Sequence, residues 1–489
     1  MTRRPSRRDF LKRVGLGTAA LAAPAAIRAS RPAAGGKPNI IVFLSDDHGW
    51  EYAGCYGNRQ VRTPNLDRLA AEGMRFTHVF AGSPTCTPSR SVLYTGLMPM
   101  RNGAAGNHSR ARPGTKSLPH YLRPLGYRVV LAHKVHVRPR EVFPFEHVRA
   151  SLTRTAFKRR YREEGLDTAA VERLLARHVR EHRDQPLCLI LAASAPHVYW
   201  EANRTYDAAA LKLPPYLVDT EATRRGMARY YQDITSMDRR LGRCLAAVRK
   251  HGLEDSTLFL YTSDQGPEWP HAKWNLYDAG LRVPFVARWP GRVKPGTVCQ
   301  AMVSLVDVLP TFVEAGGGKA PGGLDGRSFL PVLLGRAKDH RDAVFAAHVG
   351  DGNMNDYPMR CVRTRTHKYI LNLKPQNTYT THFTRAPGAD HKDIWDTWVE
   401  RAGTNADAAR LIRTFQHRAE EELFDLHRDP NEMRSVASGP ESRPVLLSLR
   451  KRVRDWMKSQ GDEASPSRAN PPPRRVPPGR QGAADNARG

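Results

Sequence analysis

Asn39-Ile40-Ile41-Val42-Phe43-Leu44-Ser45-Asp46-Asp47 begins with a nearly unbroken apolar run and ends in two carboxylates. A short apolar run without polar alternation is typical of a central strand in a parallel sheet, where both faces of the strand are buried. In such sheets, ligands and catalytic groups gather at the carboxyl ends of the strands. This stretch therefore predicts an α/β fold, and it places Asp46 and Asp47 at the edge where chemistry is expected.

Further elements of the same kind follow along the chain. Thr63 is expected to cap a helix that starts at Pro64 and stops at Gly73. Buried strands are predicted at Tyr127–Ala132, Leu187–Ala193 and Thr257–Thr262, and a long amphipathic helix from about Glu221 to Arg249. Strands that alternate with helices indicate an α/β/α sandwich around a mostly parallel sheet.

The pattern changes after about residue 340. Paired strands are expected within Met359–Leu373, a strand and turn at Glu422–Pro430, and a closing helix at Pro444–Lys458. We therefore predict a catalytic domain over residues 39–340 and a smaller C-terminal α+β subdomain over residues 341–460. Residues 461–489 are rich in Pro, Gly, Ala and Arg, and we expect a disordered tail.

The N-terminus carries the features of a twin-arginine export signal. Arg7-Arg8-Asp9-Phe10-Leu11-Lys12 precedes an apolar Gly/Ala stretch, and small residues between Ala22 and Ala29 offer cleavage sites. A basic disordered tail is the alternative. We expect residues 1–30 to be the signal peptide and 31–38 a linker. The twin-arginine machinery is then a partner, and the mature protein is periplasmic or secreted without an integral membrane segment.

Oxygen ligands follow two of the predicted strands. Asp46 and Asp47 follow the first, and Asp264 and Gln265 follow the strand at Thr257–Thr262. Four oxygen-bearing side chains suit a hard divalent cation such as Ca²⁺. A single acidic pair after a strand is more often a helix cap or turn. The presence of both groups favours a metal site.

Cys86-Thr87-Pro88-Ser89-Arg90 lies between these two groups in the sequence. A Cys followed by Pro two residues later and Arg four residues later resembles the motif of type I sulfatases. In that family the Cys is oxidised after translation to formylglycine, whose hydrate is the nucleophile. The resemblance implies an alkaline-phosphatase-like fold, a sulfuric ester or sulfamate hydrolase, and a formylglycine-generating maturation enzyme as partner. Pro88 also places Cys86 near a helix N-terminus, where the helix dipole favours a developing anion.

The resemblance covers most of residues 39–330 in the family's order, and it assigns roles. It implies a Ca²⁺ site formed by Asp46, Asp47, Asp264 and Gln265 together with the modified Cys86. Gln265 departs from the family pattern, which more often has Asn or His, although its amide oxygen can still be a ligand. Arg90 is expected to hold the hydrated aldehyde and to balance charge on the metal side of the site. Lys134, His197 and Lys273 are expected to bind sulfate oxygens, and His136 to deprotonate the second hydroxyl of the diol.

A narrower resemblance points to the sulfamidase (heparan N-sulfatase) branch of the family. It rests on the segments His136–Phe145, Tyr357–Val362 and Glu422–Glu432. The branch has an acid and an Arg flanking the His of the third basic site, where this chain has Ala195 and Val198. An O-sulfatase acting on another sulfated polysaccharide is therefore an alternative, as is a phosphonate or phosphodiester hydrolase of the same superfamily. An inactive glycan-binding relative is a further alternative.

Composition adds a weaker argument. The formal net charge is +29, of which residues 1–30 contribute +6 and residues 461–489 contribute +2, leaving +21 on the body. Such a field favours anionic partners, including a sulfated glycan, but a coding bias toward Arg explains it equally well. No basic run with interleaved aromatic residues is present, so we expect no nucleic-acid partner. No two of the six Cys share a metal-finger spacing, which argues against a zinc module.

Overall fold

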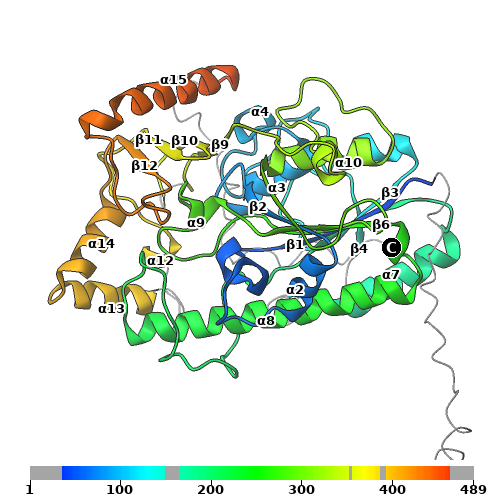
Figure 1. Cartoon of the computed structure of the whole chain (residues 1–489), viewed down its shortest axis with the longest axis horizontal. Coiled ribbons are helices and arrows are strands. Elements are labelled where there is room, and N and C mark those ends of the chain that lie inside the picture. Colours follow the sequence, from blue (N-terminus) through cyan, green and yellow to red (C-terminus); the bar gives the residue numbers. More distant parts are fainter. Residues whose placement is uncertain (1–35, 149–164, 352–354, 386–391, 463–489) are drawn as a thin grey trace, which may run out of the picture. The chain divides into compact units, whose positions relative to one another are not determined.

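The computed structural model describes residues 36–148, 165–351, 355–385 and 392–462. The predicted signal peptide, most of the linker and nearly all of the predicted tail lie outside these ranges. Within them the chain forms one eight-stranded sheet and one four-stranded sheet (Figure 1). The strands are β1 (Asn39–Ser45), β2 (Met74–Phe80), β3 (Arg128–His133), β4 (Glu146–Val148), β5 (Leu187–Ala192), β6 (Thr257–Ser263), β7 (Phe285–Arg288), β8 (Thr297–Ser304), β9 (Ala343–His348), β10 (Met359–Thr364), β11 (His367–Asn372) and β12 (Glu421–Asp425).

The large sheet has the order β4-β3-β5-β1-β6-β7-β2-β8. Strand β1 pairs in parallel with both β5 and β6, and every residue of β1 is buried, as the apolar run predicts. Strand β7 is the exception to the mostly parallel arrangement, since it runs antiparallel to β6 and β2. The connection from β6 stays at the carboxyl edge of the sheet, so the chain re-enters the sheet from that edge and runs back.

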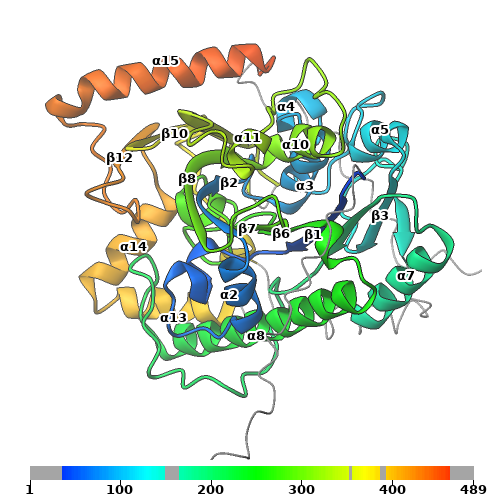
Figure 2. The same cartoon turned by 45° about the vertical axis from the view of Figure 1, so that its right-hand side comes forward.

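Helices cover both faces of the large sheet (Figures 1 and 2). One layer contains α2 (Pro64–Ala71), α7 (Thr168–Glu181) and the long α8 (Glu221–Lys250). The other contains α3 (Cys86–Thr95), α4 (Pro99–Asn102), α5 (Leu118–Leu122) and α10 (Val308–Ala315). The short helices α9 (Asp278–Leu281) and α11 (Leu330–Leu333) lie in connections. The α/β/α sandwich expected from the sequence is therefore confirmed.

The cap of α2 differs from the prediction. Thr63 occupies the N-cap position, but its side chain makes no capping hydrogen bond. Its hydroxyl instead accepts from the backbone N–H of Gly54 and donates to Asp67. The free donors at the start of α2 are satisfied from α8: Asp238 accepts from the backbone N–H groups of Asn65 at 3.1 Å and Leu66 at 2.8 Å.

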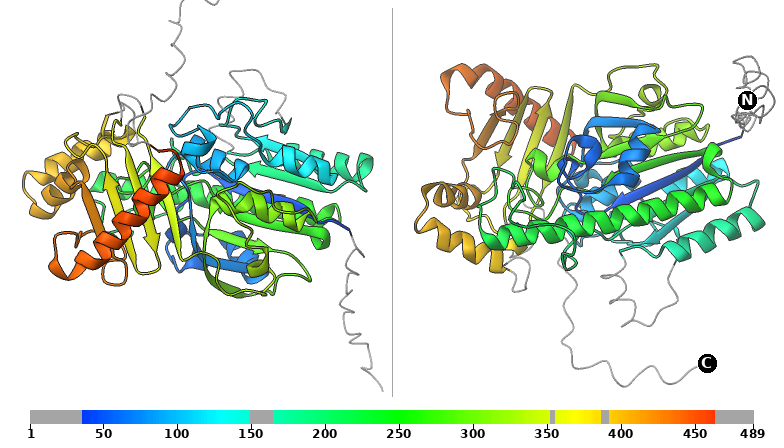
Figure 3. Two further views of the ribbon diagram at one scale, coloured as in Figure 1. Left: turned by 90° about the horizontal axis from the view of Figure 1, so that it is seen from above. Right: turned by 60° about the horizontal axis from the view of Figure 1, so that its bottom comes forward.

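The small sheet is antiparallel, with the order β12-β11-β10-β9 (Figure 3). Around it lie α12 (His382–Arg385), α13 (Lys392–Ala402), α14 (Ala406–Gln416) and α15 (Arg443–Ser459). The sequence predicted the paired strands, the strand before Pro430 and the closing helix, but not β9, α13 or α14. Asp462, the last described residue, forms a buried ion pair with Arg360 at 2.5 Å. None of the described helices has the length and apolar composition that a membrane crossing needs.

Candidate active site

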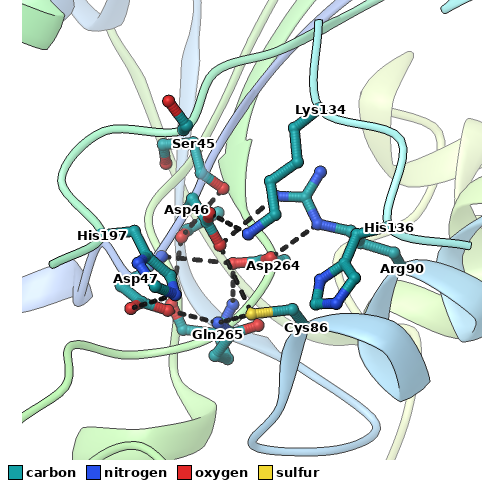
Figure 4. Close-up of polar contacts among 12 residues, drawn as sticks. Ser45, Asp46, Asp47, Cys86, Arg90, Lys134, His136, His197, Asp264 and Gln265 are labelled. Atoms are coloured by element: carbon teal, nitrogen blue, oxygen red, sulfur yellow. Dashed lines mark hydrogen bonds and ion pairs between the residues drawn. The ribbon is translucent and has the colours of Figure 1, made fainter. Parts of the chain in front are cut away.

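The carboxyl ends of β1 and β6 lie side by side, with Ser45 paired to Ser263. Asp46 and Asp47 follow β1, and Asp264 and Gln265 follow β6, so all four side chains meet at this edge (Figure 4). Helix α3 points its first residue, Cys86, at the same place. The four oxygen-bearing side chains are fully buried. Burial of three carboxylates together is expensive unless cations compensate them.

Two buried basic side chains, Arg90 and Lys134, lie against the carboxylates of Asp46 and Asp264. Arg90 Nε lies 2.8 Å from Asp264 Oδ2, and its Nη2 lies 3.5 Å from Asp46 Oδ1. Lys134 Nζ pairs with Asp46 Oδ2. Burial alone would raise the pKa of Asp46, but Lys134, His197 and Arg90 together hold it well below its ordinary value. Asp264 differs: burial raises its pKa to about 7 although Arg90 opposes the shift.

The carboxylate of Asp47 pairs with a different basic side chain, that of Lys273. Lys273 Nζ lies 2.8 Å from Asp47 Oδ2 and 2.9 Å from Glu268 Oε2. Burial would lower the pKa of Lys273, but Asp47 and the other nearby negative groups raise it well above its ordinary value. Lys273 therefore stays charged at neutral pH. Glu268 was not predicted as a site residue, and neither was His382, whose Nδ1 lies 3.7 Å from Glu268 Oε1.

Cys86 is 1% exposed and lies at the centre of these groups. Its Sγ is 3.5 Å from Asp46 Oδ1 and 3.2 Å from Gln265 Nε2. Burial raises the pKa of the thiol well above its ordinary value, even though Lys134 opposes the shift. An unmodified Cys86 would remain a thiol at neutral pH, which is a poor nucleophile. Cys86 is the first residue of α3, so it lies at a helix N-terminus, as Pro88 predicts.

Gln265 provides a test for a bound cation. Its Nε2 donates to Asp47 Oδ1 at 2.5 Å, and its Oε1 is buried without a hydrogen-bond partner among the described residues. A buried acceptor that lacks a donor beside three carboxylates is what a hard divalent ion would satisfy. The residues present therefore fit the predicted Ca²⁺ site.

The two candidate histidines lie on opposite sides of Cys86 (Figure 4). His197 follows β5, and its Nε2 lies 3.9 Å from Asp47 Oδ2. His136 follows β3, and its Nε2 lies 2.9 Å from Nδ1 of His108. Burial, with the positive charge of Lys134, holds the pKa of His136 well below its ordinary value, so its imidazole is neutral and can accept a proton.

His108 and the neighbouring Asn107 were not predicted. The backbone N–H of Thr87 donates to Asn107 Oδ1 at 3.3 Å, and the hydroxyl of Thr87 donates to the carbonyl of His136 at 3.1 Å. Thr87 thus connects the start of α3 to the loop that carries His136. No local pattern marks these residues, because they lie in irregular segments.

A cavity of about 550 Å³ is lined by six of the ten candidates. Its lining includes Asp46, Cys86, Lys134, His136, His197 and Lys273. Arg90 is fully buried and pairs with two of the carboxylates. The structure therefore brings together all ten residues that the sequence predicted as catalytic or metal-binding.

The sulfatase family model matches residues 38–318, more than half of the chain. The chain belongs to the sulfatase family. It is accordingly a hydrolase of sulfate esters or sulfamates with the alkaline-phosphatase-like fold. A second model, described as N-sulphoglucosamine sulphohydrolase, C-terminal, matches residues 268–398. That match includes β9, β10 and β11 of the small sheet and one segment of the sulfamidase resemblance, Tyr357–Val362, whereas His136–Phe145 and Glu422–Glu432 lie outside it.

Individual relatives agree with the family. This sulfatase is 33% identical over 431 residues to an ulvan-active sulfatase of Formosa agariphila, covering 87% of this chain and 81% of the relative. It is 28% identical over 458 residues to human N-sulphoglucosamine sulphohydrolase, covering 86% of this chain and 89% of the relative. A protein solved in complex with its substrate D-glucosamine-2-N,6-O-disulfate has a similar fold, with a TM-score of 0.66, 19% identity, and coverage of 88% of this chain and 100% of the other.

Proposed function

We propose that this protein is an exported sulfatase that releases sulfate from a sulfated glycan, with a heparan N-sulfatase-like preference, through formylglycine at position 86 and a bound Ca²⁺. The observation that carries the proposal is the burial of Cys86 among three carboxylates and the lysines that pair with two of them. A thiol protease would need an accessible, activated Cys beside a base, and Cys86 has neither the exposure nor the lowered pKa.

Calcium would be held by Asp46, Asp47, Asp264 and Gln265, with residue 86 beside them. When bound, the ion would supply positive charge next to the reacting sulfate group. The formylglycine hydrate would supply the attacking hydroxyl. Arg90 would hold Asp46 and Asp264 in place through its two contacts at 3.5 and 2.8 Å.

Lysines and a histidine of this chain would bind the sulfate. Lys134, His197 and Lys273 all line the cavity and lie within 4 Å of Asp46 or Asp47. A sulfate ester carries a full negative charge that repels nucleophiles, so cations fixed beforehand lower the barrier. His136 would accept the proton of the second hydroxyl, since its lowered pKa keeps the imidazole neutral at pH 7.

Substrate preference is proposed from the C-terminal half. The match to the N-sulphoglucosamine sulphohydrolase model supports a sulfated amino sugar, with the N-sulfo group as the leading candidate. An O-sulfated polysaccharide is the second candidate, because the more identical of the two relatives described is an ulvan-active sulfatase. Ala195 and Val198 line the cavity beside His197 without the charges of the sulfamidase pattern, and they favour that second candidate.

Two partners belong to the proposal. A formylglycine-generating enzyme would convert Cys86, and the twin-arginine machinery would export the folded product to the periplasm or medium. The support for export is the sequence of residues 1–30 alone.

The function can be tested directly. Intact-peptide mass spectrometry around residue 86, after co-expression with a maturation enzyme, should show conversion of Cys86 to formylglycine. Sulfate release should be measured on N-sulfated, 6-O-sulfated and 2-O-sulfated disaccharides, and phenol release should be measured on an aryl phosphonate monoester. Cys86→Ala should abolish turnover without unfolding the protein. Near-wild-type activity in that variant would end the sulfatase mechanism, and O-desulfation without N-desulfation would end the sulfamidase preference alone.

A further inference from the structure

The catalytic cavity has a second group of polar side chains in its lining. This group consists of Tyr199, Glu201, Asp233 and Arg240. The first two follow β5 in the segment that carries His197, and the other two lie on α8. None of the four has a part in the sulfate chemistry proposed above.

Contacts within the group hold its carboxyl groups in place before a ligand arrives. The backbone N–H of Glu201 donates to Asp233 Oδ1 at 3.1 Å. Ser236 donates its hydroxyl to Glu201 Oε2 at 2.8 Å, and Arg240 Nη2 lies 3.5 Å from Glu201 Oε1. Fixed positions reduce the entropy that binding costs. The Glu201 side chain nevertheless keeps 30% of its surface exposed, which leaves acceptor positions open to the cavity.

Tyr199 adds an apolar surface beside these polar groups. It is 50% exposed, and in the described ranges it is the one aromatic residue among the large apolar side chains with substantial exposure. An aromatic ring that faces a polar cavity offers a flat surface for the C–H face of a sugar ring. Carboxyl and guanidinium groups beside it offer acceptors and donors for hydroxyl groups.

The charge of this group differs from that of the sulfate-binding group. Lys134 and Lys273 bring positive charge to the carboxylates around Cys86. The second group instead has two carboxyls and one guanidinium. Burial, followed by the charge of Glu201, raises the pKa of Asp233 to about 8, so at neutral pH this carboxyl can also donate. A part of the substrate that carries no sulfate fits such a group.

We propose that Tyr199, Glu201, Asp233 and Arg240 form a sugar subsite, which binds the uncharged hydroxyl groups of the sugar whose sulfate lies beside Cys86. The inference rests on the proposed function, since it assumes a glycan substrate. It assigns recognition of the sugar ring to the segment after β5 and to α8, and it makes these residues determinants of affinity for sugar sulfates over aryl sulfates.

Binding to a variant that cannot turn over tests the subsite. In the Cys86→Ala background, calorimetry should compare three glucosamine monosulfates (N-, 3-O- and 6-O-) with 4-nitrophenyl sulfate, which has no sugar hydroxyls. Glu201→Gln or Tyr199→Ala should raise the Kd of the sugar sulfate that binds best by about tenfold or more. The Kd of 4-nitrophenyl sulfate should change by less than about twofold.

The control variant is Glu221→Gln, at an exposed ion pair with Arg225 on the same helix. This substitution should leave the Kd of the sugar sulfate and the Kd of 4-nitrophenyl sulfate unchanged. Parallel weakening of sugar and aryl ligands would mean that the four residues only support the loop of His197, and this would overturn the subsite. Unchanged Kd values in Glu201→Gln and Tyr199→Ala would also overturn it. So would tighter binding of 4-nitrophenyl sulfate than of the sugar sulfates by the Cys86→Ala protein without these further changes. Because these measurements need no conversion of Cys86, their failure is distinct from a failure of the proposed chemistry.

Discussion

Replacing Lys368 by Met should lower the free energy of unfolding by about 3–5 kcal/mol at pH 8.5. Lys368 lies on β11 and is fully buried. Its Nζ is 2.5 Å from Asp278 Oδ1, 2.9 Å from Glu432 Oε1 and 3.0 Å from the carbonyl of Leu276. Asp278 would keep Arg363 at 3.2 Å, so Glu432 is the carboxylate that loses its cation.

The destabilisation caused by Lys368→Met should increase as the pH rises. Burial raises the pKa of Glu432 to about 7, although Lys368 opposes the shift. The folded protein therefore holds the proton of the Glu432 carboxyl more tightly than the unfolded chain does. The stability that this proton contributes is lost as the pH rises through about 7. Without Lys368 the pKa of Glu432 in the folded protein rises further. The free energy of unfolding of the variant therefore continues to fall above pH 7, where that of the wild type no longer changes through Glu432. The cost of the substitution should grow by up to about 1.4 kcal/mol per pH unit.

Urea unfolding followed by Trp fluorescence at pH 6 and pH 8.5 measures this effect. Lys374→Met is the matched control, since Lys374 pairs with an exposed Asp356 and should cost about 0–1 kcal/mol. Adding Glu432→Gln to Lys368→Met should recover part of the loss at pH 8.5. A cost below about 1 kcal/mol at pH 8.5, or an equal cost at both pH values, would refute the reasoning.

Three shorter predictions concern the metal, the segment after β6 and export. Asp264→Ala should lose bound calcium and activity together, and active wild-type protein without a divalent ion in elemental analysis would contradict the assignment. Gly266→Ala should lower aryl sulfate turnover about tenfold or more, because a Cβ there would lie 1.9 Å from the carbonyl of Ala279, whereas Gly322→Ala meets nothing within 4 Å and should be neutral. Changing Arg7 and Arg8 to Lys should trap the precursor in the cytoplasm, and unchanged extracellular yield would exclude this route.

The sequence predicted the centre of the fold because its strongest signals are local. The apolar run of β1 and the polar residues after it identify a buried strand and its functional end without knowledge of the partner strands. Helices α13 and α14 were missed although a signal was available: Asn405 caps α14 by accepting from the backbone N–H of Ala408. A cap followed by helical spacing would have identified that helix.

Other features had no local signal. Asp238 caps α2 from a position 173 residues away from Asn65, and only the packing of α8 reveals it. Glu268 and His108 reach the site from irregular segments, and His382 reaches it from the first residue of the short helix α12. The positions of all three depend on the pairing of distant strands. The Cys86 motif identified the family, yet it could not indicate which side chains support its lysine and histidine.

The pairing of β1 with β6 sets a time limit on chemistry at Cys86. The site closes over Cys86 only after Ser263 has been synthesised and has paired with Ser45, which requires 177 further residues. At about 5–20 residues per second, that interval lasts on the order of 10–35 s. Once the chain has folded, the side chain is 1% exposed at the start of α3. The maturation enzyme that we propose for Cys86 would therefore compete with folding, and slower translation between residues 86 and 263 should raise the fraction of converted protein.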